Sequence, residues 1–316
     1  MKDAFNRDIT YLRLSLTERC TLKCAYCRAG EGNCPKQKEL STEQFLRIVR
    51  VMAQLGIEKV RLTGGEPMLR HDLFDLILGI RTIPGIREIA MTTNGQHLPG
   101  QSAALKKAGL DRLNISIDSL RPKRYAALTG GGSLSAVLTS IDEALAAGFS
   151  PLKLNAVLLR GQNDDEIDDF LALTRELPID VRFIELMPMG ATDHTDRRIR
   201  SDEILARHPQ LVPLPPRYAS QPSADYAIPG YCGRIGLISP MSHRFCQDCN
   251  RVRVLSDGML RPCLGDNHEV SLLPALAAAQ DDLLLETIRQ AIYTKPAANG
   301  FSDAFCTARN MSKIGG

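Results

Sequence analysis

The feature that most constrains the fold is an alternation of strand-like and helix-like segments over the first two thirds of the chain. Helical patterns separate six short β-rich segments, at 10–17, 57–63, 88–93, 112–118, 152–159 and 180–187. Parallel strands need a crossover connection, which a helix usually provides, so the alternation predicts an α/β fold with a parallel sheet. Six units are fewer than the eight of a closed barrel, and the pattern leaves open a partial barrel or a doubly wound sheet.

Local end signals define one of the helices. Ser41 and Gln44 have the spacing of a capping box, which satisfies backbone N–H groups at a helix start, and Gly56 is a typical stop. They predict a helix that opens at Ser41 and runs through Leu55. Segments 134–147 and 166–176 have similar helical patterns.

The rhythm changes after about Gly190. Residues 213–230 are rich in Pro, Ser and Ala, a composition that predicts an irregular connection. Beyond it, 234–239 and 251–264 have the pattern of short strands, with Asp257-Gly258 as a hairpin turn, and 283–293 has a helical pattern. A boundary is therefore expected near this point, between residues 1–195 and a smaller part, 196–316.

Size and composition are those of a globular protein. The 316 residues are 44% apolar, and the net charge of +3 is too small to indicate a nucleic-acid or membrane partner. No apolar run approaches the roughly 18 residues of a membrane span, and the polar start lacks the apolar core of a secretory signal. We therefore expect a cytoplasmic protein, in which the nine cysteines are reduced and available for metal binding or redox chemistry.

Three of these cysteines form a compact motif directly after the first predicted strand. Cys20, Cys24 and Cys27 have the spacing C-x3-C-x2-C, in a loop where a barrel would present ligands at its active face. A four-iron cluster normally has four cysteine ligands, so three leave one iron open to a small molecule. The bare pattern leaves a zinc site or unrelated buried thiols as alternatives.

The context of this motif resembles the radical S-adenosylmethionine superfamily. Members carry this cysteine spacing with an aromatic residue before the third cysteine, here Tyr26, and a glycine-rich motif that Gly64-Gly65-Glu66-Pro67 matches. Two glycines after a strand allow close approach of a ligand to the backbone, although they also suit a tight turn. The resemblance implies that the amino and carboxylate groups of S-adenosylmethionine chelate the open iron.

A second set of cysteines lies in the C-terminal part. Cys246, Cys249 and Cys263 form C-x2-C-x13-C across the predicted hairpin, again without an obvious local fourth ligand. The spacing fits a second open iron–sulfur cluster. It also fits a zinc site completed by Cys232 or His243.

Two arginines follow the second of these cysteines. In an extended strand Arg251 and Arg253 project from the same face, and guanidinium groups suit phosphate recognition through paired hydrogen bonds. A solvated face is the alternative for paired arginines. The adjacent cysteines favour the phosphate interpretation.

Taken together, the motifs resemble the GTP 3′,8-cyclase family, whose members catalyse the first step of molybdenum-cofactor biosynthesis. The resemblance rests on both cysteine motifs, the glycine-rich motif, FIELMP at 183–188, CNRVR at 249–253 and the terminal Gly315-Gly316, and it covers nearly the whole chain. It implies a partial, open (βα)6 TIM-like barrel in residues 1–195 that carries the first cluster. It also implies that the extension, 196–316, carries the second cluster across the barrel's opening.

The resemblance further assigns roles to individual residues. The first cluster and S-adenosylmethionine are expected to bind Cys20, Cys24, Cys27, Tyr26, Gly65, Ser116 and Met187. The second cluster is expected to bind Cys246, Cys249 and Cys263, and GTP to bind Arg13, Arg61, Thr92, Lys153, Arg251, Val252 and Arg253. Without the resemblance, Lys153 reads as a solvated lysine, Ser116 as a packed strand residue and Met187 as core. The terminal glycines are expected to reach the active site, with a disordered terminus as the alternative.

The resemblance implies the reaction as well. Two 4Fe–4S clusters and S-adenosyl-L-methionine would be the cofactors, and a 5′-deoxyadenosyl radical would remove the C3′ hydrogen of GTP so that C3′ attacks C8 of guanine. The product would be (8S)-3′,8-cyclo-7,8-dihydroguanosine 5′-triphosphate. Expected partners are an electron donor such as flavodoxin or ferredoxin and the next enzyme of molybdopterin synthesis, and the chain is expected to be a monomer or a homodimer.

Two other functions remain to be weighed. One is a radical S-adenosylmethionine enzyme with an auxiliary cluster that modifies a peptide, and the other is a non-enzymatic iron–sulfur or zinc protein that senses redox state. The sequence also departs from the family pattern at Arg28-Ala29, where Met-Pro is common, and this puts the local conformation of the cofactor loop in doubt. Cys34, in the same loop, and Cys306 fit neither cysteine motif and are assigned no function.

Overall fold

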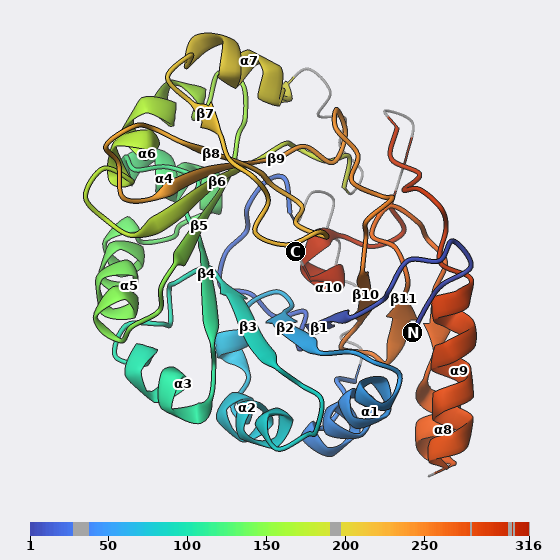
Figure 1. Ribbon diagram of the computed structural model, residues 1–316. Coiled ribbons are helices and arrows are strands. Elements are labelled where there is room, and N and C mark those ends of the chain that lie inside the picture. The colour runs from blue at the N-terminus through green and yellow to red at the C-terminus, as the bar shows by residue number, and fades with distance from the viewer. Residues whose placement is uncertain (28–37, 190–196, 279, 303–304, 306, 316) are drawn as a thin grey trace.

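Six parallel strands follow one another in chain order around an arc, as the alternation predicts (Figure 1). The computed structural model describes residues 1–27, 38–189, 197–278, 280–302, 305 and 307–315. The six strands are β1 (Tyr11–Ser15), β2 (Lys59–Thr63), β3 (Glu88–Thr93), β4 (Arg112–Ser116), β5 (Leu152–Val157) and β6 (Ile179–Ile184). Each strand pairs in parallel with the next, which confirms the predicted α/β fold.

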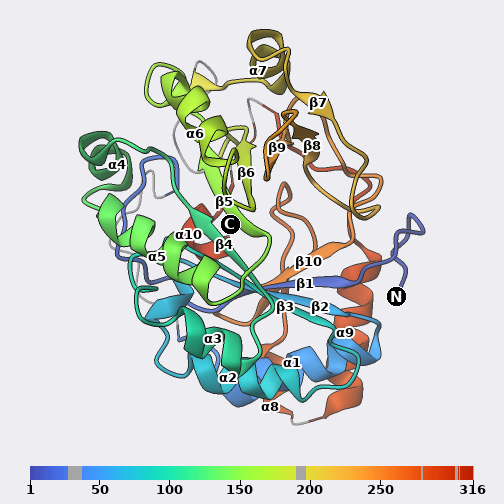
Figure 2. The ribbon, with the colours of Figure 1, turned by 60° about the vertical axis from the view of Figure 1, so that its left-hand side comes forward.

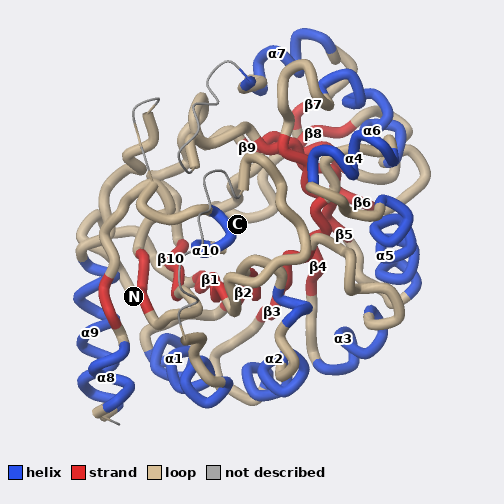
Figure 3. The backbone as a smooth tube through the Cα atoms, turned by 180° about the vertical axis from the view of Figure 1, so that it is seen from behind, coloured by secondary structure: helices blue, strands red, loops and turns tan. Residues whose placement is uncertain are grey.

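Helices cover the outer side of this arc, and the strands form its inner wall (Figures 2 and 3). The helices are α1 (Thr42–Gln54), α2 (Leu73–Arg81), α3 (Ser102–Ala108), α4 (Pro122–Thr129), α5 (Leu134–Ala146) and α6 (Ile167–Leu173), with short 3-10 turns η1 (Pro67–Leu69) and η2 (Asp164–Glu166). Among the described residues, no helix has both the length and the apolar character to cross a membrane.

The C-terminal part extends the same sheet at both edges. Its elements are α7 (Ser201–Arg207), β7 (Val212–Pro213), β8 (Ala224–Ala227), β9 (Arg234–Ile238), β10 (Arg251–Val254), β11 (Met259–Arg261), β12 (Val270–Ser271), α8 (Leu273–Ala277), α9 (Asp281–Tyr293) and α10 (Met311–Ile314). Strand β10 pairs in parallel with β1, and β9 with β6, while β12 and β7 end the sheet without pairing to each other. The barrel is therefore partial and open.

One predicted connection is wrong in part. Residues 213–230 were expected to be irregular, but β8 lies within them and pairs antiparallel with β9. The expected hairpin is confirmed, since β10 and β11 pair antiparallel around a turn in which Gly258 has a φ of +85°. The expected boundary after residue 195 falls outside the described residues and stays a prediction.

Alternation along the strands separates a core face from an inner face. On β1, Leu12 and Leu14 are fully buried in the hydrophobic core between sheet and helices, and Arg13 lies between them in the sequence. On β10, Val252 and Val254 are likewise in that core, and Arg253 lies between them. Because successive side chains of a strand point to opposite faces, the arginines project into the hollow of the arc.

The predicted capping box is present at the start of α1. The backbone N–H of Gln44 donates to Ser41 Oγ at 3.3 Å, and the backbone N–H of Ser41 donates to Gln44 Oε1 at 2.9 Å. Gly56 follows the last residues of the helix with a φ of +94°, a conformation that glycine adopts without strain. These contacts fix the direction in which the chain returns to β2.

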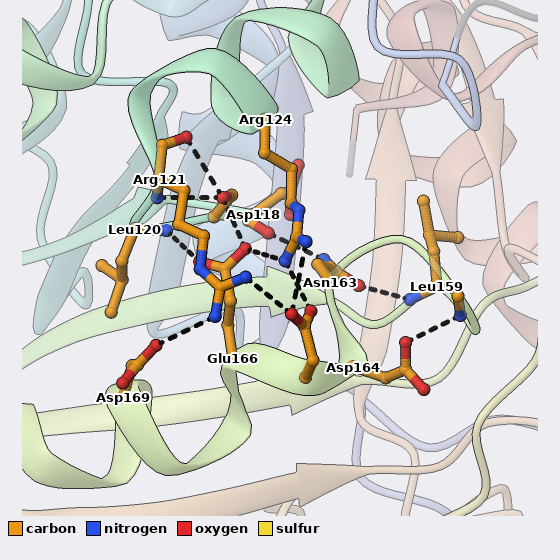
Figure 4. A network of polar contacts seen from close by, with 12 residues as sticks. Asp118, Leu120, Arg121, Arg124, Leu159, Asn163, Asp164, Glu166 and Asp169 are labelled. Atoms are coloured by element: carbon orange, nitrogen blue, oxygen red, sulfur yellow. Dashed lines mark hydrogen bonds and ion pairs between the residues drawn. The ribbon is translucent and has the colours of Figure 1, made fainter.

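A network of polar contacts joins α4 to the turn before α6 and supports the loop after β4 (Figure 4). Glu166 is fully buried and accepts hydrogen bonds from Ser119 Oγ at 2.7 Å and from the backbone N–H of Leu120 at 2.6 Å. Arg124 Nη1 donates to the same carboxylate at 2.7 Å. The carboxylate thus ties one helix and one loop to the turn after β5.

Replacing Glu166 by alanine is expected to lower the free energy of unfolding by about 2–3 kcal/mol, because buried donors of Ser119 and Leu120 lose their acceptor. Anaerobic urea denaturation measures the change. The matched control is Arg121→Ala, which removes only exposed ion pairs with Asp165 and Asp169 and is expected to cost under about 0.5 kcal/mol. Equal losses in the two variants would contradict the role of the buried carboxylate.

Candidate active site

Two adjoining cavities lie in the hollow of the partial barrel. The first is at the carboxyl ends of the strands, where barrel enzymes usually hold their reacting groups, and the second lies towards the amino ends of β1 and β10. The residues that line both are Thr92, Asn155, Ile184, Met187 and Met311. A molecule bound in one cavity can therefore contact a molecule bound in the other.

All seven residues expected to bind the first cluster or S-adenosylmethionine line the first cavity. They are Cys20, Cys24, Tyr26, Cys27, Gly65, Ser116 and Met187. They come from the loop after β1, the loop after β2, the end of β4 and the segment after β6. Their convergence is a property of the fold, since they are distant from one another in the sequence.

The surroundings of the first three thiols fit ligands of a metal cluster. Cys20 Sγ accepts hydrogen bonds from the backbone N–H of Leu22 at 3.4 Å and from Asn94 Nδ2 at 3.6 Å, contacts that stabilise a ligating thiolate. Burial raises the pKa of the Cys24 thiol, and the nearby Asp118 carboxylate raises it further. Such a thiol ionises when a metal supplies positive charge, so the set suits metal binding better than free thiolate chemistry.

Tyr26 is held in place by a buried carboxylate. Its hydroxyl donates to Asp118 Oδ2 at 2.7 Å, and the backbone N–H of Val157 donates to Oδ1 at 2.9 Å. Asn163 Nδ2 donates to the backbone oxygen of Asp118 at 2.7 Å, which links this position to the network of Figure 4. Burial raises the pKa of Asp118 to about 6. The ring of Tyr26 is therefore fixed at the wall of the first cavity.

The two glycines of the glycine-rich motif are needed by the chain's own packing. A Cβ on Gly64 would lie 2.5 Å from the backbone oxygen of Thr17, and one on Gly65 would lie 2.3 Å from that of Arg19. The backbone N–H of Gly65 donates to Thr17 O at 2.7 Å. The close backbone approach inferred from the sequence is thus an approach to the loop that carries Cys20, and Gly65 lines the first cavity as well.

The second cavity is strongly cationic. Its described lining includes six cationic side chains and no Asp or Glu; the six are Arg13, Arg61, Arg182, Arg251, Arg253 and Lys295. Strand register places Arg13 directly between Arg253 of β10 and Arg61 of β2. Three guanidinium groups therefore stand side by side on three neighbouring strands.

Burial and neighbouring positive charge shift the pKa values of two side chains in this cavity. Burial, together with the nearby Arg251, lowers the pKa of Arg253 to about 10. Burial raises the pKa of Tyr11, but Arg61 and Arg13 outweigh it and bring the value to about 8. The Nε atoms of Arg251 and Arg253 are buried without a hydrogen-bond acceptor among the described residues. A bound polyanion would relieve both the repulsion and the unmet hydrogen bonds.

Two residues expected to bind GTP do not line either cavity. Val252 is fully buried in the core, because it alternates with the two inward-facing arginines of β10, so only its backbone could contact a nucleotide. Lys153 is buried in β5, with its Nζ 3.7 Å from Asp180 Oδ2. Arg217 already binds both oxygens of that carboxylate, at 2.5 and 2.9 Å.

The second cysteine triad lines the second cavity. Cys246 Sγ accepts hydrogen bonds from the backbone N–H and from Nδ2 of Asn299, both at 3.3 Å. Burial raises the pKa of Cys249, but Lys295 and Arg251 outweigh it, and the net pKa is lowered. The donors to Cys246 and the cations near Cys249 favour thiolates at these two positions, whereas burial raises the pKa of Cys263.

The zinc alternative for the second triad depends on Cys232 or His243 as a fourth ligand. Within the described part of the chain, no three His, Cys, Asp or Glu side chains are close enough together to hold one metal ion. Cys232 and His243, the candidate fourth ligands, do not line this cavity.

The C-terminal tail enters the hollow from the open side (Figure 1). Ser15 Oγ donates to the backbone oxygen of Lys313 at 3.2 Å. Gly315 has a φ of +80°, and a Cβ there would lie 2.3 Å from Thr63 Oγ1. Arg309 holds the base of the tail through Asp257 at 2.6 Å. Gly316, like Arg28, Ala29, Cys34 and Cys306, lies outside the described residues.

Comparison with known proteins assigns the chain to a family. Residues 14–174 match the Radical SAM superfamily, and residues 179–301 match Molybdenum Cofactor Synthesis C. The GTP 3′,8-cyclases of Alkaliphilus oremlandii (strain OhILAs) and Alkaliphilus metalliredigens (strain QYMF) are 48% and 47% identical to it, over the full length of both chains. This chain belongs to the GTP 3′,8-cyclase family. It is a radical S-adenosylmethionine enzyme, which excludes the non-enzymatic sensor.

Solved structures of more distant enzymes share the fold of this cyclase-family chain. SuiB of Streptococcus suis bound to S-adenosylmethionine is 16% identical, with a TM-score of 0.62 over 90% of this chain and 68% of that one. Native anSMEcpe with bound AdoMet is 12% identical, with a TM-score of 0.61 over 91% and 81%. At these identities the likeness shows the fold alone, and it confirms the partial barrel.

Several residues that line the second cavity were not predicted from the sequence. Tyr11, Asn114, Asn155 and Arg182 line the second cavity, and the first three stand two positions from expected residues of the same strand. Every second side chain of a strand points to the same face, and this alternation could have indicated Tyr11, Asn114 and Asn155. Lys295 comes from the loop after α9, where the sequence carries no comparable signal.

Proposed function

We propose that this enzyme converts GTP to (8S)-3′,8-cyclo-7,8-dihydroguanosine 5′-triphosphate with S-adenosyl-L-methionine, as the first step of molybdenum-cofactor biosynthesis. One observation carries the proposal: a thiol-lined cavity at the carboxyl ends of the strands adjoins a cationic cavity that contains a second thiol triad. The first suits a cluster and its ligand, and the second suits a nucleoside triphosphate. The relatives that match over their full length are GTP 3′,8-cyclases, and that activity takes a nucleoside triphosphate as its substrate.

Each cavity's residues have a distinct task in this reaction. Cys20, Cys24 and Cys27 would hold one 4Fe–4S cluster, and Cys246, Cys249 and Cys263 a second. When bound, the first cluster and S-adenosylmethionine supply the 5′-deoxyadenosyl radical that removes the C3′ hydrogen of GTP. Arg13, Arg61, Arg251 and Arg253 would bind the triphosphate. Met187 and Met311 line both cavities and would exclude water from the space between the reactants.

The proposal extends to the setting of the enzyme. Residues 1–195 would form the barrel and 196–316 the extension that carries the second cluster. An electron donor such as flavodoxin or ferredoxin would serve it in the cytoplasm. Product would pass to the next enzyme of molybdopterin synthesis.

Anaerobic reconstitution tests the reaction. The loaded protein is incubated with GTP, S-adenosylmethionine and a reductant, and the mixture is examined by mass spectrometry for 5′-deoxyadenosine and the cyclised nucleotide. Both products are expected. Absence of 5′-deoxyadenosine would refute the radical reaction, whereas 5′-deoxyadenosine with unmodified GTP would refute the substrate and leave the radical chemistry standing.

Nucleotide binding is expected to take up a proton at Lys153. Burial, together with the nearby Arg182 and Arg112, lowers the pKa of its ammonium to about 6, so without nucleotide the side chain is largely neutral at pH 7. The negative charge of a nucleotide in the nearby second cavity favours the ammonium form without direct contact, so the contribution of Lys153 to affinity should grow as the pH falls from about 8 towards 6. Calorimetry in buffers of different ionisation enthalpy measures the uptake.

Comparison with the Lys153→Met variant separates proton uptake by Lys153 from proton uptake by the nucleotide. The variant should bind GTP with less proton uptake than the wild type and with a flatter pH dependence. Equal uptake by both proteins would show that Lys153 does not change its protonation state on binding.

A further inference from the structure

Asn114 is a buried polar residue of the second cavity to which the sequence assigned no role. It lies in β4 and is only 4% exposed. Its Oδ1 atom accepts no hydrogen bond from any described residue. A buried amide oxygen without a donor is destabilising, and native structures usually supply one. A molecule bound in the second cavity could supply the missing hydrogen-bond donor.

The polar groups beside Asn114 are already engaged. In the register of the sheet, Asn114 lies between Thr92 of β3 and Lys153 of β5. Thr92 Oγ1 accepts a hydrogen bond from Arg61 Nη1 at 3.2 Å, and Lys153 Nζ lies 3.7 Å from Asp180 Oδ2. The neighbours therefore form their own contacts, and the Oδ1 acceptor remains for a ligand.

An open acceptor selects a donor on the ligand. Phosphate oxygens at neutral pH are acceptors, so the donors that GTP offers are the ribose hydroxyls and the N–H groups of guanine. This chemistry excludes the triphosphate as the partner of Asn114 Oδ1.

Position in the barrel decides between ribose and guanine. The second triad and the arginines of β10 lie at one edge, and three strands, β1, β2 and β3, separate β10 from β4. Asn114 instead lies two residues, roughly 6–7 Å along the strand, from Ser116, which lines the first cavity. Its neighbour Thr92 lines both cavities. Asn114 thus stands near their junction, where a ribose must lie to be reached from the first cavity.

We propose that Asn114 accepts a hydrogen bond from a ribose hydroxyl of GTP and so presents the ribose to the first cavity. This rests on the proposed function, since it takes GTP as the occupant of the second cavity. Asn114 is then a substrate-positioning residue.

Binding measurements with substrate analogues test the contact. Calorimetry on the anaerobically reconstituted enzyme compares GTP, 2′-deoxyGTP and 3′-deoxyGTP for the wild type and for Asn114→Ala. Loss of the contacted hydroxyl should weaken binding to the wild type about tenfold and binding to the variant less than about twofold. The deoxynucleotide with the larger effect identifies the hydroxyl.

Two controls distinguish the ribose contact from other causes. Asn114→Asp keeps the Oδ1 acceptor and should keep the penalty for the deoxynucleotide, whereas Asn114→Leu fills the side-chain volume and should lose it, as Asn114→Ala does. Inosine triphosphate lacks the amino group of guanine. It should bind more weakly than GTP by the same factor in the wild type and in Asn114→Ala.

Two results would overturn the inference. One is an equal deoxynucleotide penalty in the wild type and in the alanine and leucine variants. The other is an inosine penalty that disappears with Asn114, which would move the contact to guanine. A wild type that does not bind GTP would refute the proposed function as well, whereas a wild type that binds GTP with an unchanged penalty in the variants refutes only the role of Asn114.

Discussion

Replacing Cys24 by alanine is expected to abolish the formation of 5′-deoxyadenosine, whereas replacing Cys263 by alanine is expected to spare it and to abolish the cyclised nucleotide. The two thiols line different cavities. Loss of a residue that merely supports a metal ligand costs about 10–100-fold, so loss of a ligand should lower the dependent activity at least about a hundredfold. The two triads thus have separable effects.

Iron analysis and product analysis on the same samples measure both effects. Each variant is expected to lose about four irons per chain relative to the wild type, because each triad would hold one four-iron cluster. Cys232→Ala is the matched control: that cysteine is exposed and lines neither cavity, so iron content and both products should be unchanged. Cyclised nucleotide from Cys263→Ala, or 5′-deoxyadenosine from Cys24→Ala, would contradict the division of labour.

The barrel could be predicted from the sequence because its signals are local. The capping box of Ser41 and Gln44 and the turn at Gly258 act over a few residues, and each is present. The strand β8 was missed because its composition is that of a connection. Pairing with β9 provides backbone hydrogen bonds that composition does not reveal, a case in which tertiary contacts override propensity.

The candidate site also has one part that local sequence patterns predict and another part that depends on tertiary contacts. The cysteine spacings and the glycine-rich motif point to the first cavity, and all the residues expected there line it. The cationic layer depends instead on the pairing of β10 with β1, which brings Arg253 beside Arg13 across 240 residues of chain. Local patterns do not encode such a register. Asn114 remained unassigned for a related reason, since its significance is an unmet hydrogen bond.

Replacing Gly315 by alanine is expected to lower formation of the cyclised nucleotide at least about tenfold, because left-handed strain of roughly 1–2 kcal/mol adds to a steric clash. The φ of Gly315 is +80°, and the new Cβ would lie 2.3 Å from Thr63 Oγ1. Thr63 cannot easily move, since its hydroxyl donates to the backbone oxygen of Leu14 at 3.1 Å within the barrel wall. The tail must then shift, together with Met311, which lines both cavities.

A second glycine of the chain separates the clash from the backbone strain. Gly148 has a φ of +78°, and a Cβ at this position would meet no neighbouring atom within 4 Å, so Gly148→Ala carries the strain alone and should leave product formation nearly unchanged. The quantity to measure is the amount of cyclised nucleotide formed per 5′-deoxyadenosine. A displaced tail should lower this ratio, because the radical would form without cyclising GTP. Adding Thr63→Ala to Gly315→Ala removes the clashing hydroxyl and should restore part of the yield. Equal yields from Gly315→Ala and Gly148→Ala would show that the tail's fit against Thr63 does not matter for the reaction.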